Sequence, residues 1–437
     1  MIKRYRKIIQ LELNEISREV IGQLIAKGEL PNFGRLEREW GYVATTSESE
    51  YDKLEPWIQW VTAHTGKTYA EHGIFRLSDA QNLEVPQLWE TLSARGIESG
   101  IIGSMNATRG NTEGGMFFPD PWAKENMAHP ASLKPLWSLI SSRVQGHATG
   151  GLGVGDLLRG ARSMLQYKLP PGLYVKIGRQ LVTQKLKPTK KWQLAGYFDL
   201  LLYELFDSIR RSTDFGYYTL FLNAVAHYQH HYWRNFDRSD FAQDITYPDI
   251  GPNDDPMTFG YRMYDRILGH LLNVADEDTL VIVASGLTQV PYTAKEKEGG
   301  MNYYRLNDHN AFADLIGLAG EGYEVFPLMS RDWQIGYAGE TERKRILETL
   351  GGLRVGDQPL FTIKENTPGF VFIETAYTRR SDGQTITDAS GKMFGAFDQF
   401  FTNIAIKSGH HSGTGHVWMS DAAVAAAYPE GRMPLTE

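Results

Sequence analysis

The 437-residue sequence has no cysteine, no excess of basic charge and no long apolar run. Without cysteine, the chain has no disulfide, no thiolate metal ligand and no cysteine nucleophile. The net charge of -7 argues against a nucleic-acid polymer as a partner, because such partners require a basic surface. No stretch approaches the ~18–20 consecutive apolar residues of a membrane-spanning helix. These absences remove several classes of site and partner before any motif is considered.

The N-terminal segment is basic, but it does not have the composition of a signal peptide. Its apolar run at 8–13 is interrupted by Gln10 and Glu12. A signal peptide needs about 7–15 apolar residues followed by a small-residue cleavage site. We therefore interpret residues 8–13 as a first buried strand and expect a cytoplasmic protein with no transmembrane segment.

Aromatic side chains are plentiful, with 10 Trp, 22 Tyr and 20 Phe, which is enough for a large core and for aromatic-walled pockets. Short apolar runs rich in β-branched residues alternate with helical patterns along most of the chain. The expected strands are 8–13, 99–104, 218–225, 279–284 and 369–375, and the expected helices are 17–27, 88–95, 261–272 and 342–350. This alternation predicts an α/β fold with a parallel sheet covered by helices.

Strand signals disappear between residues 133 and 214, where the pattern is helical and an apolar stripe runs through 194–209. We expect a helical insertion or cap at 133–214, inserted in a core made of 1–132 and 215–437. Its middle is basic, with Lys176, Arg179, Lys185, Lys187, Lys190 and Lys191. These cations are either a solvated helix face or an anion-attracting rim over an active site.

Five stretches of the chain follow one another in the order and spacing of a known family. They are IIQLELNEIS with LPNFGRLEREWG, then HTGKTYAEHGI, then LWETLSARGIESGIIGSMNA, then FFPDPW, and finally TLFLNAVAHYQHHYW with FGYRMYDRILGHLL and TLVIVASGL. Together they resemble the alkaline phosphatase superfamily, nearest its type I phosphodiesterase/nucleotide pyrophosphatase branch. The resemblance implies a large, mostly parallel central sheet with helices on both faces. It also implies an active site at the carboxyl ends of the strands, where open α/β sheets bind ligands.

In that family two divalent metals flank the phosphoryl group, and this chain departs from the ligand pattern. The aspartate that ends the first strand falls on Asn14. The hydroxyl nucleophile falls on Pro56, beside Glu55. The Ser-Asp-His-Gly motif falls on Ser285 and residues 286–288, which read Gly-Leu-Thr. The resemblance therefore implies that the first metal subsite has lost nearly all of its ligands.

The second subsite keeps more of the pattern. The family's Asp-x-x-x-His reads Asn223-x-x-x-His227, and a late histidine falls on His410 or His411, of which we prefer His411. Glu55 can add a carboxylate to the same pocket. Asn14, Glu55, Asn223, His227, Ser285 and His411 are expected to share one cleft.

Each of these residues also has an ordinary structural interpretation. A single histidine at a strand end is usually hydrogen-bonded within the fold rather than bound to a metal. Asn14 with the following glutamate can cap the next helix. Arg76, which follows the His-Gly-Ile turn, suits a bidentate anion contact or a surface salt bridge. Asp308 and His309 are a further candidate, as a displaced ligand pair.

The sequence predicts a hydrolase or transferase, phosphodiesterase-like, that acts on a small-molecule or glycan phosphoester. The roles are Glu55 and His227 as catalytic groups, Asn14, Arg76 and Ser285 as substrate contacts, and Asn223, His227 and His411 as metal ligands. The few carboxylates that remain cannot compensate the charge of two adjacent divalent cations. We therefore expect one divalent metal or none. Imidazole ligands favour zinc or manganese. The alternative is a catalytically inactive pseudoenzyme or binding protein that retains the fold and the pocket.

Overall fold

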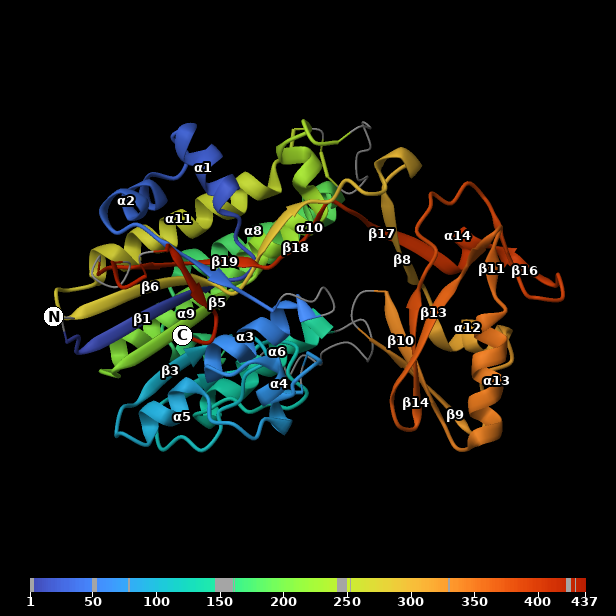
Figure 1. Cartoon of the computed structure of the whole chain (residues 1–437), viewed down its shortest axis with the longest axis horizontal. Helices are drawn as coiled ribbons and strands as arrows, with labels where there is room; N and C mark the ends of the chain where they lie inside the picture. The colour runs from blue at the N-terminus through green and yellow to red at the C-terminus, as the bar shows by residue number, and fades with distance from the viewer. Residues whose placement is uncertain are drawn as a thin grey trace. The chain divides into compact units, whose positions relative to one another are not determined.

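The computed structural model describes residues 4–48, 53–77, 79–145, 160, 162–241, 250–251, 253–328, 331–421, 426–428 and 430–437. These residues form two compact units (Figure 1). Unit 1 comprises Met1–Asp237, Pro248–Pro291 and Gly409–Glu437, and unit 2 comprises Arg238–Tyr247 and Tyr292–Ser408. The sequence predicts one core made of 1–132 and 215–437, without a separate unit 2.

Unit 1 is built around an eight-stranded sheet with the order β20-β2-β19-β6-β1-β5-β3-β4. Its strands are β1 (Lys7–Leu13), β2 (Val43–Thr46), β3 (Ser99–Ile102), β4 (Met116–Phe118), β5 (Tyr217–Leu222), β6 (Thr279–Ser285), β19 (Thr414–Met419) and β20 (Arg432–Pro434). Strand β19 runs antiparallel to both of its neighbours, and the other pairings are parallel. The predicted α/β fold with a mostly parallel central sheet is confirmed.

Helices cover both faces of this sheet. Tyr218 and Phe221 lie three residues apart on β5, so their side chains point to opposite faces. Phe206 of α9 packs edge-to-face on Tyr218, and Trp60 of α3 packs edge-to-face on Phe221. The helices on the Tyr218 face include α2 (Pro31–Glu39), α9 (Gln193–Ser212) and α11 (Pro256–Val274), and those on the Phe221 face include α3 (Pro56–Thr65) and α5 (Leu88–Ser93).

The described residues between 133 and 214 are helical and contain no strand. They form α6 (Lys134–Gln145), α8 (Pro171–Leu186) and α9, with short 3-10 turns, while 146–159 and 161 lie outside the described residues. The apolar stripe expected at 194–209 belongs to α9, which packs directly on the sheet through Phe206. An insertion or cap at 133–214 as a separate domain stays a prediction.

Unit 2 has its own core and its own sheets. One antiparallel sheet has the order β13-β14-β10-β9 and packs around Trp333, Ile335, Val371 and Ile373. Its strands are β9 (Tyr323–Pro327), β10 (Asp332–Tyr337), β13 (Phe361–Thr367) and β14 (Phe370–Thr375), with α12 (His309–Leu315) and α13 (Glu340–Gly351) among its helices. The strand expected at 369–375 and the helix expected at 342–350 are therefore β14 and α13.

Asp308 and His309, the candidate displaced ligand pair, lie at the start of α12 in unit 2. Asp308 is the N-cap residue of α12, and its carboxylate accepts a hydrogen bond from the backbone N–H of Ala311. This is the ordinary role of aspartate at a helix start. None of the described helices has both the length and the apolar composition needed to cross a membrane.

Candidate functional site

The site begins with Glu15, which follows the carboxyl end of β1. The ladder between β1 and β5 continues one residue past β1, where the Asn14 N–H donates to the carbonyl of Leu222 over 3.0 Å. Glu15 then adopts a left-handed backbone with φ 56°. This conformation is costly for a residue with a Cβ, by about 1–3 kcal/mol, and such strain gathers at functional sites. The turn places a carboxylate that is only 2% exposed at the carboxyl edge of the sheet.

His230 reaches this carboxylate from α10 (Ala224–Phe236), the helix that directly follows β5. Its Nε2 lies 3.0 Å from Glu15 Oε2. The neighbouring Gln229 fixes the helix against the Glu15 turn, because its Nε2 donates to the Glu15 carbonyl over 2.7 Å. Tyr261 holds that amide in place by donating its hydroxyl to Gln229 Oε1 over 2.7 Å. These two hydrogen bonds therefore fix the part of α10 from which His230 points toward Glu15.

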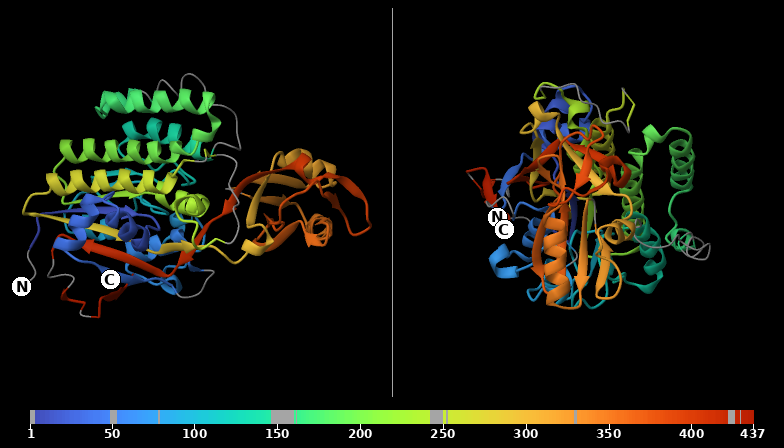
Figure 2. Two further views of the ribbon diagram at one scale, coloured as in Figure 1. Left: turned by 90° about the horizontal axis from the view of Figure 1, so that it is seen from above. Right: turned by 90° about the vertical axis from the view of Figure 1, so that its right-hand side faces the viewer.

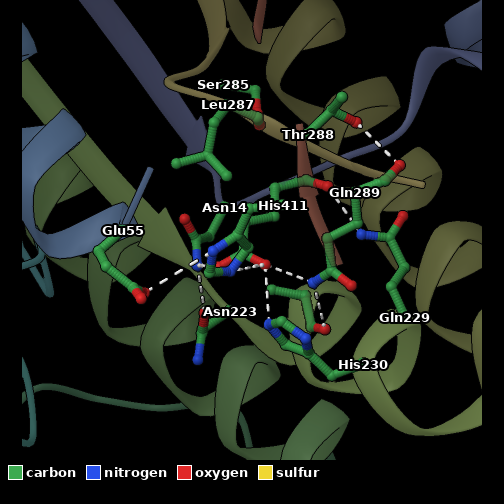
Figure 3. A network of polar contacts seen from close by, with 12 residues as sticks. Asn14, Glu55, Asn223, Gln229, His230, Ser285, Leu287, Thr288, Gln289 and His411 are labelled. Carbon is green, nitrogen blue, oxygen red and sulfur yellow. Dashed lines mark hydrogen bonds and ion pairs between the residues drawn. The ribbon is translucent and has the colours of Figure 1, made fainter. Parts of the chain in front are cut away.

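His411 arrives on β18 (Gly409–Ser412), which pairs antiparallel with β7 (Thr288–Pro291). Gln289 lies directly opposite His411 in this ladder, so both side chains stand on the same face. His411 Nε2 lies 3.3 Å from Glu15 Oε2, and Gln289 Nε2 donates to the same oxygen. Strand β18 can approach α10 because residue 409 is glycine. A Cβ at this position would lie 2.6 Å from the Gln229 carbonyl oxygen. Figure 3 shows the side chains of His230, Gln289 and His411 pointing toward one another.

Asn14 has its amide orientation fixed by Trp60. The indole Nε1 of Trp60 is only a donor, and it donates to Asn14 Oδ1 over 2.9 Å. Asn14 Nδ2 therefore faces the site, where it donates to Glu15 Oε1 over 2.9 Å and to Asn223 Oδ1 over 2.8 Å. Because an N–H group points at Asn223, a cation has no place between Asn14 and Asn223.

The site carries a negative charge on Glu15. Burial raises the pKa of a carboxyl group, but the imidazoles of His411 and His230 outweigh burial and hold the pKa of Glu15 well below its usual range. The amide donors of Asn14 and Gln289 also favour the anion. The carboxylate is thus ionised and contacted by four side chains.

Glu15, His230 and His411 fit a metal ion. One ligand atom from each lies within 4.8 Å of the other two. Zinc bound at about 2.0–2.1 Å in a tetrahedron sets neighbouring ligand atoms about 3.3 Å apart, and the Glu15 Oε2 to His230 Nε2 and His411 Nε2 distances are 3.0 and 3.3 Å. Two imidazoles with one carboxylate are also a ligand set that zinc prefers.

His227, expected as a ligand, is not part of this group. Its ring packs 4.7 Å from that of His231, one helical turn away, and its side chain is exposed. His230, three residues further along α10, contacts Glu15 instead. The three histidines of HYQHH were a visible signal, but the family spacing pointed to the first of them.

Two other expected residues lie close to the site. Glu55 is the N-cap residue of α3, and its Oε2 lies 3.7 Å from His411 Nδ1 with a third of its side chain exposed. Asn223 joins the network through Asn14. His410 pairs with Val290 beside the Gln289 position, so strand alternation turns it to the face opposite His411.

Ser285 and Arg76 are not part of the hydrogen-bonded network around Glu15. Ser285 is buried, and its hydroxyl donates to the Leu287 carbonyl over 2.5 Å. Arg76 follows α4 (Tyr69–His72) and is half-buried, and its carbonyl accepts a hydrogen bond from Asn106. Their expected contact with substrate stays a prediction.

No protein-family model and no curated protein matches the chain. Solved structures match over most of its length at low identity. Phosphonoacetate hydrolase from Sinorhizobium meliloti 1021 is 12% identical, with a TM-score of 0.41 and coverage of 95% of this chain and 90% of that chain. Murine ectonucleotide pyrophosphatase/phosphodiesterase 5 is 11% identical, with a TM-score of 0.39 and coverage of 94% and 87%. A variant of the alkaline phosphatase PafA is 12% identical, with a TM-score of 0.44 and coverage of 100% and 94%.

Proposed function

We propose that the protein is a phosphodiesterase-like hydrolase or transferase with one divalent metal, zinc or manganese, held by Glu15, His230 and His411. The crowding around Glu15 Oε2 is the observation that carries this proposal. Three nitrogens surround that oxygen, from His230, His411 and Gln289, whereas a carboxylate oxygen has two lone pairs. A cation bound by both imidazoles would replace two of these donors and satisfy both rings and the carboxylate.

A second metal beside the first is not part of the proposal. The Asn14 amide turns its N–H groups toward Asn223 and Glu15, which repels a cation at that position. Leu287, fully buried, stands where the family has a metal-binding side chain. Two adjacent dications would repel strongly in a site of low dielectric constant, and Glu15 is the carboxylate in direct reach.

When bound, the metal supplies Lewis-acid polarisation of a phosphoryl oxygen. The chain supplies the remaining groups. Glu55 is partly exposed and lies beside His411, which suits a general base that accepts the proton of an attacking water or alcohol. Pro56, at the expected position of the nucleophile, has no hydroxyl. The hydroxyl of the nearby Thr62 is buried and forms a 3.2 Å hydrogen bond with His72. These two residues favour direct attack over a covalent phosphoenzyme.

Elemental analysis of the purified protein, combined with turnover of bis(4-nitrophenyl) phosphate, tests this function. We expect close to one equivalent of zinc or manganese per chain and measurable hydrolysis. Glu55→Gln should keep the metal and lose turnover, because Glu55 acts on the proton rather than on the ion. Two tightly bound equivalents, or full turnover in Glu55→Gln, would contradict the assignment. Small-molecule and glycan phosphoesters are the substrates to screen next.

The amide pair Asn14–Asn223 favours a second candidate, a binding protein that kept the pocket without turnover. Asn14 Nδ2 donates to Asn223 Oδ1, so a hydrogen bond rather than a cation joins the two side chains. Its signature would be binding of a sugar phosphate or nucleotide by metal-free protein, with no hydrolysis after addition of zinc or manganese. The cytoplasmic location suggested by the N-terminal segment stays a prediction, which fractionation of cells that express the full chain would check.

A further inference from the structure

The basic segment in the helical region is unusually free of acidic residues. The chain has a net charge of -7, yet residues 165–192 contain no Asp or Glu. The cations of that stretch are Lys168, Lys176, Arg179, Lys185, Lys187, Lys190 and Lys191. A solvated helix face usually mixes both signs, so a run of one sign points to an anionic partner.

Helix α8, which spans most of this stretch, also presents apolar side chains to solvent. Val175, Val182 and Leu186 are 69%, 58% and 77% exposed. Their spacing of seven and four residues places all three on one stripe of the helix. The opposite face carries the buried Leu173 and Gln180. The stripe therefore faces away from the packing that holds the helix.

Cations flank the stripe on both sides. At 100° per residue, Arg179 and Lys176 lie to one side of it and Lys185 lies to the other, and all three are exposed. Among the described residues no carboxylate forms an ion pair with any of them. Burial raises the pKa of Glu204, and the charge of Lys176 only partly offsets this rise. By contrast, Lys190 just beyond the helix is paired with Asp254.

Helix α8 is also the outermost helix of unit 1. It packs on α9, the helix that covers the sheet, and both views in Figure 2 show it, in green, at the outer margin of the helical layers. Nothing else in the described part of unit 1 covers the stripe. An extended surface could reach it without moving the core.

We propose that this face of α8 is a docking surface for an anionic lipid bilayer. A helix with an apolar stripe and a polar face rich in lysine and arginine lies in the membrane interface, with its apolar face buried about 5–10 Å. The long side chains of Lys176, Arg179 and Lys185 can then reach the headgroups while their stems follow the apolar stripe. A second copy of the same face is disfavoured, because it would bring two wholly basic segments together.

Vesicle co-sedimentation of the full chain tests the surface. We expect binding to phosphatidylcholine vesicles that contain phosphatidylserine, little binding to phosphatidylcholine alone, and release at high salt. Each cation near an anionic leaflet is worth about fivefold in the partition coefficient. Arg179→Glu with Lys185→Glu should therefore lower the partition coefficient by about 25-fold or more.

The apolar stripe needs its own variant and a matched control. Val175→Ser, Val182→Ser and Leu186→Ser combined should lower binding at least about tenfold, since each side chain loses its apolar burial. Met393→Ser, at a 68% exposed apolar position in unit 2, should leave binding unchanged. Circular dichroism and the bis(4-nitrophenyl) phosphate assay check that the variants fold.

Three outcomes would overturn the proposal. Equal binding to neutral vesicles would remove the role of charge. Unchanged binding of the stripe variant would remove the role of α8. Lipid-independent dimers that dissociate in the stripe variant, measured by analytical ultracentrifugation, would make the face a contact between two copies of the chain.

Discussion

Two buried carboxylates lie on either side of Asn223, and burial has opposite outcomes for them. Glu15 is 2% exposed and reaches Asn223 through Asn14, while Asp199 is 1% exposed and accepts the Asn223 N–H directly over 2.9 Å. The pKa of Glu15 is held well below its usual range. Burial raises the pKa of Asp199 to about 7. The two groups have similar solvent exposure, so the difference comes from their partners.

The partners of Asp199 are neutral. They are the N–H groups of Asn223 and Ala224, at the first turn of α10, and the hydroxyl of Tyr264. Asp199 thus takes the place of a capping side chain that Asn223 does not provide. Glu15 faces two imidazoles instead. One carboxylate fixes the start of the helix, and the other pairs with a histidine of the same helix.

Removing the charge at Glu15 should have the largest effect. Glu15→Gln keeps the shape of the side chain and removes the anion, so zinc affinity should fall by more than the 10–100-fold loss that is typical of outer-shell partners. Isothermal titration of metal-depleted protein measures it. Glu55→Gln is the control, since Glu55 approaches only the far nitrogen of His411 and should change affinity by less than about tenfold. An equal loss of zinc affinity in both variants would contradict the assignment of Glu15 as a metal ligand.

The raised pKa of Asp199 should make the stability of the fold depend on pH. A carboxyl whose folded pKa is raised stabilises the fold fully below its unfolded pKa, near 3.8, and loses that contribution as pH rises toward 7. Asp199→Asn should therefore be less sensitive to pH, and its stability relative to the native chain should improve between pH 5 and pH 8 by on the order of 2 kcal/mol. Urea unfolding at both pH values measures this. Asp278→Asn, at an exposed position, is the control, and a native-like pH dependence of Asp199→Asn would disprove the assignment.

A substitution at Gly409 should change the surroundings of Glu15 without changing those of Asp199. Gly409→Ala places a Cβ against the Gln229 carbonyl and Gln289 Oε1, at 2.6 and 2.4 Å, so β18 must shift and carry His411 with it. Overpacking of this kind costs about 1–3 kcal/mol. Zinc affinity should fall while the pH dependence that belongs to Asp199 remains. Gly22→Ala, where nothing lies within 4 Å of the new Cβ, should leave both properties intact, and an unchanged zinc affinity in Gly409→Ala would show that His411 does not depend on this close approach.

The sheet could be predicted from the sequence because its strands are short apolar runs in a fixed order. Residues 8–13 and 279–284 became β1 and β6 almost unchanged. The run at 218–225 ended earlier, since β5 stops at Leu222 and Asn223 is the N-cap residue of α10. Unit 2 was not separated because its antiparallel strands have no family motif and follow the same alternation of strands and helices.

The site could be predicted only to within a residue or a helical turn. Asn14, Glu55, Asn223 and His411 do gather at the carboxyl edge of the sheet. The carboxylate itself was missed, because Glu15 enters the site through a left-handed turn that no spacing rule anticipates. His227 was chosen over His230 for the same reason. The carboxylate lies one residue after the expected position, on Glu15 instead of Asn14. The histidine that contacts it lies three residues after the expected position, on His230 instead of His227.

The smallest expected effect concerns that choice. His227 and His230 stand on the same helix, about 60° apart around its axis, and only His230 contacts Glu15. His227→Ala should therefore change zinc affinity by no more than about twofold, since it removes no ligand. His230→Ala removes one of three ligands, so its affinity should fall on the order of 100-fold. Titrating both variants under one set of conditions decides the matter: a larger loss in His227→Ala would return the metal to the histidine that the family spacing indicated and would leave the Glu15–His230 pair as a structural contact.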